Sequence, residues 1–179
     1  MVTGHLSTAY LARAKWPRSE IVALLVASML PDLADFVLPQ GNQCRTSCGL
    51  YTHAFPAILV LALLASGLAW AIWHRRSTAL LVGALVCLHP LFDLITGHKP
   101  YWFGGPQVGL VLYRVTLIDF VLESALLIVG WVVLRRTKDA PRLAVAYPTL
   151  IALIALQAAF DAYLYRIMGP TSGGVGLIR

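Results

Sequence analysis

The chain has 179 residues, of which 59% are hydrophobic and only 12% are charged. A typical soluble domain is about 25% charged, and a soluble domain of this length could not bury so much apolar surface in one core. The composition therefore excludes a disordered chain, a coiled coil and an ordinary cytosolic enzyme. It predicts an all-α, polytopic membrane helical bundle that forms a single integral-membrane domain over residues 1–179.

The net charge is +6, from 14 Lys and Arg against 8 Asp and Glu. These basic residues lie in short clusters between apolar runs, which is the pattern of membrane proteins with basic cytoplasmic loops. We therefore expect membrane lipids as partners and no nucleic acid. The sequence leaves the oligomeric state open.

A short N-terminal helix, amphipathic or re-entrant, is predicted at residues 5–15. About five transmembrane helices are expected after it, because a span needs about 20 apolar residues. The second of these segments contains no charged residue and is the clearest. The predicted spans are residues 20–38, 55–73, 78–97, 111–134 and 143–166.

Basic residues concentrate in three segments that alternate along the predicted bundle, at residues 13–18, 74–76 and 135–142. The positive-inside rule places all three in the cytoplasm. The longer connections, residues 39–54 and 98–110, then face outward. We expect a multi-pass protein of the plasma (inner) membrane whose functional site faces the extracytoplasmic side.

Acidic and imidazole side chains recur at one depth, in the outward half of the predicted bundle. A charged side chain within a span costs roughly 2.5–3.5 kcal/mol, so protons or cations must neutralise these groups. The residues concerned are His5, Asp32, Asp35, His53, His89, Asp93, His98, Asp119, Glu123 and Asp161.

Several of these residues form pairs whose members are separated by about one helical turn and therefore share a helix face. The pairs are Asp32 with Asp35, His89 with Asp93, and Asp119 with Glu123. Imidazole and carboxylate ligands without thiolate suit zinc, manganese or iron. We expect one to three divalent metal ions, with zinc favoured. The expected ligands are His5, Asp32, His53, His89, Asp93, His98, Asp119 and Glu123.

Simpler interpretations stay open for some of these residues. Asp161 could form a hydrogen bond with a neighbouring helix, His5 could be an ordinary residue of an amphipathic helix, and His98 could be a solvated loop residue. The three cysteines are too few for a disulfide scaffold. Cys44 and Cys48 could form a disulfide in an outward loop, and Cys87 is expected to be a buried apolar residue.

Four motifs follow one another along residues 4–135: Gly4-His5, Leu30-Pro31-Asp32, Tyr51-Thr52-His53, and the stretch from His89 to Gly97 (HPLFDLITG). Their order and spacing resemble a family of bacterial inner-membrane metal-dependent hydrolases, also called LexA-binding inner-membrane-associated hydrolases. Residues 104–110 resemble a subgroup of small membrane proteins of that type. The family pattern has Asp and His where this chain has Ala34 and Asp35, and Ser where it has Ala54.

A more distant similarity links the order of these residues to the zinc-dependent phospholipase C and P1 nuclease group. That resemblance implies a helical enzyme whose zinc cluster cleaves phosphoesters. The group has a His-x-x-x-Glu pair where this chain has Asp119 and Glu123.

The sequence therefore predicts a membrane-embedded metal-dependent hydrolase that attacks a lipid or amphiphilic substrate, with a phosphoester favoured, through metal-activated water. Asp35 and Asp32 are the expected catalytic carboxylates. The residues expected to bind an anionic substrate are Lys99, Tyr101, Tyr113 and Arg114. One alternative is a proton-coupled transporter or channel that uses intramembrane carboxylates. Another is a non-catalytic scaffold that metal stabilises.

Overall fold

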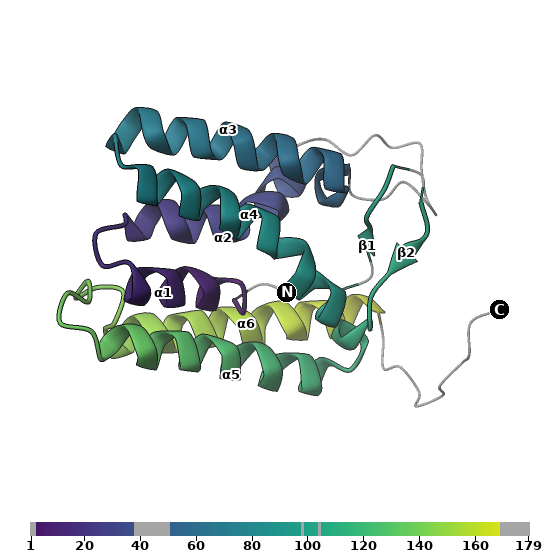
Figure 1. The fold of residues 1–179 in the computed structure, drawn as a ribbon. Helices are drawn as coiled ribbons and strands as arrows, with labels where there is room; N and C mark the ends of the chain where they lie inside the picture. The colour runs from purple at the N-terminus through teal and green to yellow at the C-terminus, as the bar shows by residue number, and fades with distance from the viewer. Residues whose placement is uncertain (1–2, 38–50, 98, 104, 169–179) are drawn as a thin grey trace.

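The computed structural model describes residues 3–37, 51–97, 99–103 and 105–168. Six α-helices run alternately in opposite directions through this part of the chain (Figure 1). They are α1 (Leu6–Lys15), α2 (Ile21–Val37), α3 (Phe55–Trp73), α4 (Arg76–Thr96), α5 (Thr116–Arg135) and α6 (Tyr147–Met168). The all-α prediction is confirmed for the described residues, and the bounds of α3 coincide with the predicted second span.

Short elements connect these helices at one end of the bundle. Two 3₁₀ turns, η1 (Tyr51–His53) and η2 (Leu112–Arg114), precede α3 and α5. The antiparallel strands β1 (Lys99–Pro100) and β2 (Gln107–Val108) form a small hairpin after α4. The sequence predicted only a loop there, because strands of two residues carry no periodic pattern.

Three described helices, α3, α4 and α5, are long and apolar enough to cross a membrane, judged by length and composition. The predicted count of five spans is not confirmed. Helix α2 has 17 residues, which corresponds to about 26 Å at 1.5 Å per residue. Helix α6 has 22 residues but contains Asp161 and Arg166. Membrane crossing by α2 and α6 therefore stays a prediction.

Helix α1 lies inside the bundle, against α2 and α5. Its small side chains Ser7, Ala9 and Ala12 are buried, and they let α5 approach closely. A Cβ atom on Gly130 would lie 2.9 Å from the Cα atom of Ser7. The predicted short N-terminal helix is confirmed, and its ten residues give a length of only about 15 Å, too short to cross a membrane.

The apolar core has two parts, and α1 contributes to both. Ala9 and Ala12 pack with residues of α2, α3 and α4, whereas Tyr10 packs with Leu127 and Leu134 of α5 and with residues of α6. The Tyr10 hydroxyl also donates a hydrogen bond to the Ala144 carbonyl, at 3.3 Å. The short helix thus joins the α2–α4 half to the α5–α6 half.

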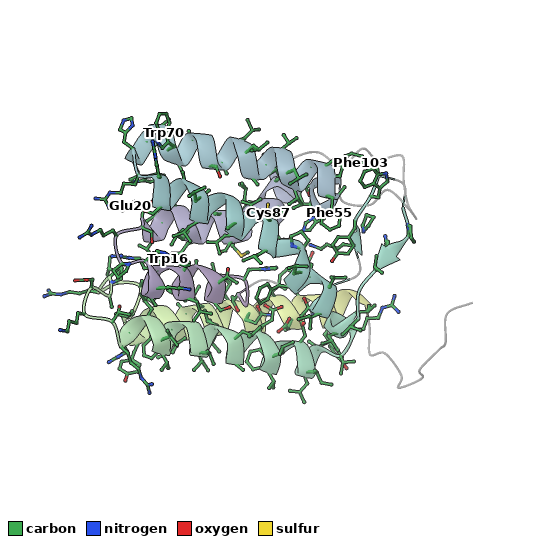
Figure 2. The ribbon with its side chains drawn as sticks, in the orientation of Figure 1. Trp16, Glu20, Phe55, Trp70, Cys87 and Phe103 are labelled. Carbon is green, nitrogen blue, oxygen red and sulfur yellow. The ribbon has the colours of Figure 1, made fainter. Side chains whose placement is uncertain are left out.

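The two ends of the bundle differ in character. At the hairpin end, α2 and α4 finish and α3 and α5 begin, close to β1 and β2 (Figure 1). At the opposite end, which we call the basic end, α1, α3 and α5 finish and α2, α4 and α6 begin. Phe55 and Phe103 lie at the hairpin end, and Trp16, Glu20 and Trp70 at the basic end (Figure 2).

Of the three cysteines, only Cys87 lies within the described residues. Cys87 is an exposed free thiol on α4, so its predicted burial is wrong. It points outward because the opposite face of α4, with Val86 and His89, packs into the bundle. Cys44 and Cys48 lie outside the described residues, and their disulfide stays a prediction.

Candidate metal centre

A cluster of two imidazoles and two carboxylates lies at the hairpin end. One potential ligand atom from each of Asp32, His53, His89 and Asp93 lies within 4.8 Å of the others. The side chains come from α2, η1 and α4. His53, His89 and Asp93 are fully buried, whereas the Asp32 side chain is 25% exposed. The cluster therefore opens to its surroundings on the side of Asp32.

Helix α4 supplies two of these side chains from one face. His89 and Asp93 are four residues apart, and His89 Nε2 lies 3.2 Å from Asp93 Oδ2. The same face carries the buried residues Val82 and Val86 toward the other end of the helix. The predicted pairing of His89 with Asp93 on one helix face is confirmed.

The His89 ring is fixed from behind by the backbone of α2. Its Nδ1 lies 2.8 Å from the Ser28 carbonyl oxygen, so an N–H there donates to the carbonyl and leaves Nε2 toward the cluster. Metal-binding histidines commonly use the second ring nitrogen in this way, which fixes the tautomer and the orientation of the ring.

His53 is held in the same manner by a carboxylate. Its Nδ1 lies 3.0 Å from Asp35 Oδ2, and the Thr52 hydroxyl donates a hydrogen bond to the other oxygen of Asp35. His53 Nε2 then lies 3.2 Å from Asp32 Oδ1 and 3.1 Å from Asp93 Oδ2. Both imidazoles thus turn Nε2 toward the two carboxylates.

The ammonium group of Lys99 enters the cluster from β1. Its Nζ lies 3.0 Å from Asp32 Oδ1, 3.0 Å from Asp93 Oδ2 and 2.6 Å from His53 Nε2. Lys99 was predicted to bind substrate at the mouth of the site. The structure places its charge against three of the four candidate ligands, and its role in substrate binding stays a prediction.

The charges of these groups depend on one another. Burial lowers the pKa of Lys99, but the carboxylates of Asp32 and Asp93 raise it further, to above its usual value. Burial also lowers the pKa of His53, and hydrogen bonds to the surrounding carboxylates raise it to about 10. Both shifts have the same cause, the carboxylates that surround these two nitrogens, which lie 2.6 Å apart.

His5 lies beside the four-residue cluster, at the start of α1. Its Nε2 is 3.2 Å from Asp93 Oδ1, the oxygen that faces away from His89 and Lys99. Its ring stacks on that of His89, with centroids 3.8 Å apart. Burial lowers the pKa of His5 to about 3, so the imidazole is neutral at physiological pH and available as a ligand.

Asp119 and Glu123 belong to a second group of buried carboxylates, together with Asp161. The Gly4 N–H donates to Glu123 Oε2 at 3.2 Å, and the Gln157 amide donates to both oxygens of Asp161 at 3.0 Å. The structure does not bring Asp119 or Glu123 among the four clustered ligands. The hydrogen-bond partner of Asp161 in the described structure is Gln157 on the same helix, so the expected hydrogen bond to a neighbouring helix is not confirmed.

The remaining predicted residues lie around the hairpin. The Tyr101 hydroxyl donates to the Pro90 carbonyl at 2.7 Å, and the Tyr101 carbonyl accepts from the Phe55 N–H at 2.9 Å. These bonds fasten the hairpin to α4 and α3. Burial raises the pKa of Tyr101 to about 12. Arg114 is exposed in η2. His98 and the side chain of Tyr113 lie outside the described part of the chain.

Sequence reasoning did not identify two supports of the cluster, Ser28 and Thr52. Ser28 lies one helical turn before Asp32, and Thr52 directly precedes His53. The position of Thr52 next to the predicted ligand His53 was a usable sequence signal. For Ser28, the backbone carbonyl makes the contact, so the residue type carried no information.

The fold and the cluster define a helical membrane protein with a buried histidine–aspartate centre at one end of its bundle. Residues 1–164 match the family model of the YdjM inner membrane protein, and the chain therefore belongs to that family. No curated protein and no solved structure is significantly similar to the chain. The match agrees with the resemblance to inner-membrane hydrolases, whereas the distant similarity to phospholipase C and P1 nuclease gains no support.

Proposed function

We propose that this chain is a membrane-embedded metal-dependent hydrolase that acts on a lipid or amphiphilic substrate, with a phosphoester as the favoured bond. One observation carries the proposal: both buried imidazoles, His53 and His89, turn Nε2 toward a carboxylate pair while Nδ1 is anchored behind them. Two imidazole nitrogens and one carboxylate oxygen suit a zinc ion that keeps its fourth position open for water.

The residues present fit a cation, because the cluster already surrounds one. The Lys99 ammonium contacts Asp32 and Asp93 at 3.0 Å each. In our proposal His53, His89 and Asp93 hold the metal ion, which leaves a fourth position for water. Asp32 lies beside that position, and His5 supports Asp93 from its other oxygen. A bound zinc ion would lower the pKa of a coordinated water molecule to near neutrality.

The other side chains take roles that follow from their contacts. Asp35 forms contacts with Thr52 and His53. We therefore propose that Asp35 orients the His53 ring, in place of the proton transfer that the sequence had suggested. Asp32 is the most exposed carboxylate of the cluster and is the better candidate to accept a proton from water. Lys99, once displaced from the carboxylates, is positioned to bind an anionic group of the substrate.

Apolar residues next to the ligands support an amphiphilic substrate. Leu33 follows Asp32, and Phe55 lies two residues after His53. These two side chains are 44% and 49% exposed. A substrate with an apolar tail could therefore contact the surface beside the cluster while its polar group reaches the ligands.

Proton-coupled transport is the second candidate function. Buried carboxylates within membrane helices commonly form proton pathways, and Asp119, Glu123 and Asp161 form a group apart from the metal candidates. A proton flux in liposomes that contain the purified protein, without hydrolysis and without bound metal, would favour this function.

The test of the proposed function is the metal content of the detergent-purified protein, measured by elemental analysis. A His89→Ala, Asp93→Ala double variant removes two proposed ligands. Asp161→Asn is the matched control, because it removes a buried carboxylate at the same end outside the cluster. We expect metal in the wild type and the control and loss from the double variant. Folded wild-type protein that takes up neither zinc nor manganese would contradict the proposal.

A further inference from the structure

An open cavity of about 710 Å³ lies at the basic end of the bundle, far along the helices from the metal centre. It is bounded by the end of α1, the connection to α2, the start of α4 and the segment after α5. Its charged lining residues are Arg13, Lys15, Arg18, Arg75 and Asp139. Four basic side chains against one acidic side chain give the cavity a positive potential that favours an anion.

Arg13 is the most informative of these side chains. Its Nη2 donates to the Asp139 carbonyl at 3.3 Å. Its Nε and Nη1 atoms are buried, and neither has a hydrogen-bond partner within the described part of the chain. Buried donors without an acceptor are rare in folded proteins. The Arg13 side chain lines the cavity beside three other basic side chains, and a guanidinium is well suited to phosphate oxygens.

The start of α4 adds further donors to the same cavity. Among the described residues, no side chain caps this helix, and Ser77 in its first turn lines the cavity. The first N–H groups of a helix have no partner within it, and the helix dipole favours an anion at this position. Arg75 also lines the cavity, although its Nη1 forms an ion pair with Glu20 Oε1 at 2.9 Å.

The position of the cavity indicates which anion reaches it. It lies where α3 ends and α4 begins, two helices that are apolar enough to cross a membrane. Trp16 and Trp70 are 42% and 53% exposed at the same end (Figure 2), as is typical of residues at the level of lipid headgroups. Basic pockets between membrane helices bind anionic lipid headgroups.

We propose that this cavity binds the phosphate group of an anionic phospholipid. A free phosphate ion has the same chemistry, but the position of the cavity between the end of α3 and the start of α4 favours the lipid. The site is independent of the metal centre at the hairpin end, so its test does not depend on hydrolysis or on metal.

The test compares two double variants that each remove two positive charges from the basic end. Arg13→Gln with Arg18→Gln removes charge from the cavity, and Arg136→Gln with Arg142→Gln removes charge from exposed positions outside its lining. The readout is the concentration of short-chain phosphatidylglycerol that half-maximally raises the unfolding temperature of the full chain in neutral detergent. Phosphatidylcholine with the same acyl chains and inorganic phosphate are the comparison ligands.

We expect phosphatidylglycerol to stabilise the wild type at lower concentration than phosphatidylcholine, and inorganic phosphate to have little effect. The cavity variant should need about tenfold more phosphatidylglycerol, and the outer variant about the wild-type amount. An equal loss in both variants, or no preference for phosphatidylglycerol, would overturn the proposal. Full stabilisation by inorganic phosphate alone would overturn the assignment to a lipid.

Asp139→Asn keeps the test decisive where the arginine variants fold poorly. It removes the one acidic side chain from the described lining of the cavity, so phosphatidylglycerol should bind more tightly, by about fivefold. A damaged fold would not produce tighter binding. Unchanged or weaker binding by this variant would contradict the site.

Discussion

The ammonium group of Lys99 lies 3.0 Å from Asp93 Oδ2, the same oxygen that lies 3.2 Å from His89 Nε2. A metal ion held by His89 and Asp93 would share that oxygen with Lys99. Two cations cannot both occupy the space between the carboxylates without strong repulsion. Lys99 and a metal ion therefore compete for the cluster.

Replacement of Lys99 by methionine should raise the affinity for zinc by about tenfold, or about 1.4 kcal/mol. The variant keeps a side chain of similar length but removes the competing charge. The measurement is a competition titration with a zinc chelator. Lys138→Met, at the basic end, is the control and should leave the affinity unchanged. Weaker zinc binding by Lys99→Met would show that the ammonium supports the metal site instead.

The contact between Asp35 and His53 leads to a second prediction. Asp35→Asn removes the charge that orients the His53 ring, and loss of such a support lowers metal affinity by about 10–100-fold. The same chelator titration measures the effect. Asp161→Asn serves as the control, because its carboxylate contacts Gln157 and not the cluster. If Asp35→Asn binds zinc with wild-type affinity, Asp35 does not support the metal site.

Close packing of α1 on α5 makes Gly130 intolerant of a side chain. In Gly130→Ala the new Cβ would lie 2.9 Å from both the Cα atom and the carbonyl oxygen of Ser7, and backbone atoms cannot move aside cheaply. We expect a loss of about 1–3 kcal/mol in the free energy of unfolding, measured by thermal or denaturant unfolding in detergent.

Gly67→Ala is the matched control for this substitution. Gly67 lies within α3, and a Cβ atom there would meet nothing within 4 Å. Alanine is a better helix former than glycine, by up to about 1 kcal/mol, so this variant should be neutral or more stable. Equal losses in both variants would show that the contact with Ser7 does not limit packing.

Gln157 fastens the residues before α1 to α6. Its Oε1 accepts from both the N–H and the hydroxyl of Thr3, and its Nε2 donates to Asp161. In Gln157→Leu these buried groups lose their partner, which costs about 1–3 kcal/mol or more of stability. Unfolding in denaturant measures this cost. The exposed Gln107 on β2 provides the control, and Gln107→Leu should change stability by less than about 0.5 kcal/mol.

The sequence predicted the helices better than the connections between them. The run of apolar residues from Phe55 to Trp73 located α3 at its observed bounds, because length and hydropathy are local properties. The hairpin of Lys99 and Val108 depends on pairing between segments, and residues 38–50 lie outside the described structure. The interior position of α1 was also missed, since a helix with small side chains can pack inside a bundle without a strong apolar pattern.

The sequence by itself determined the membrane class, the helical fold and the end of the bundle at which the polar residues gather, because hydropathy and helical spacing set which residues share a face and an end. Only the tertiary structure decided which faces meet. The His89–Asp93 face turns toward Asp32 and His53, whereas the Asp119–Glu123 face belongs to the group around Gly4. The rotation of each helix about its axis follows from packing with distant segments, and a spacing along one helix does not contain that information.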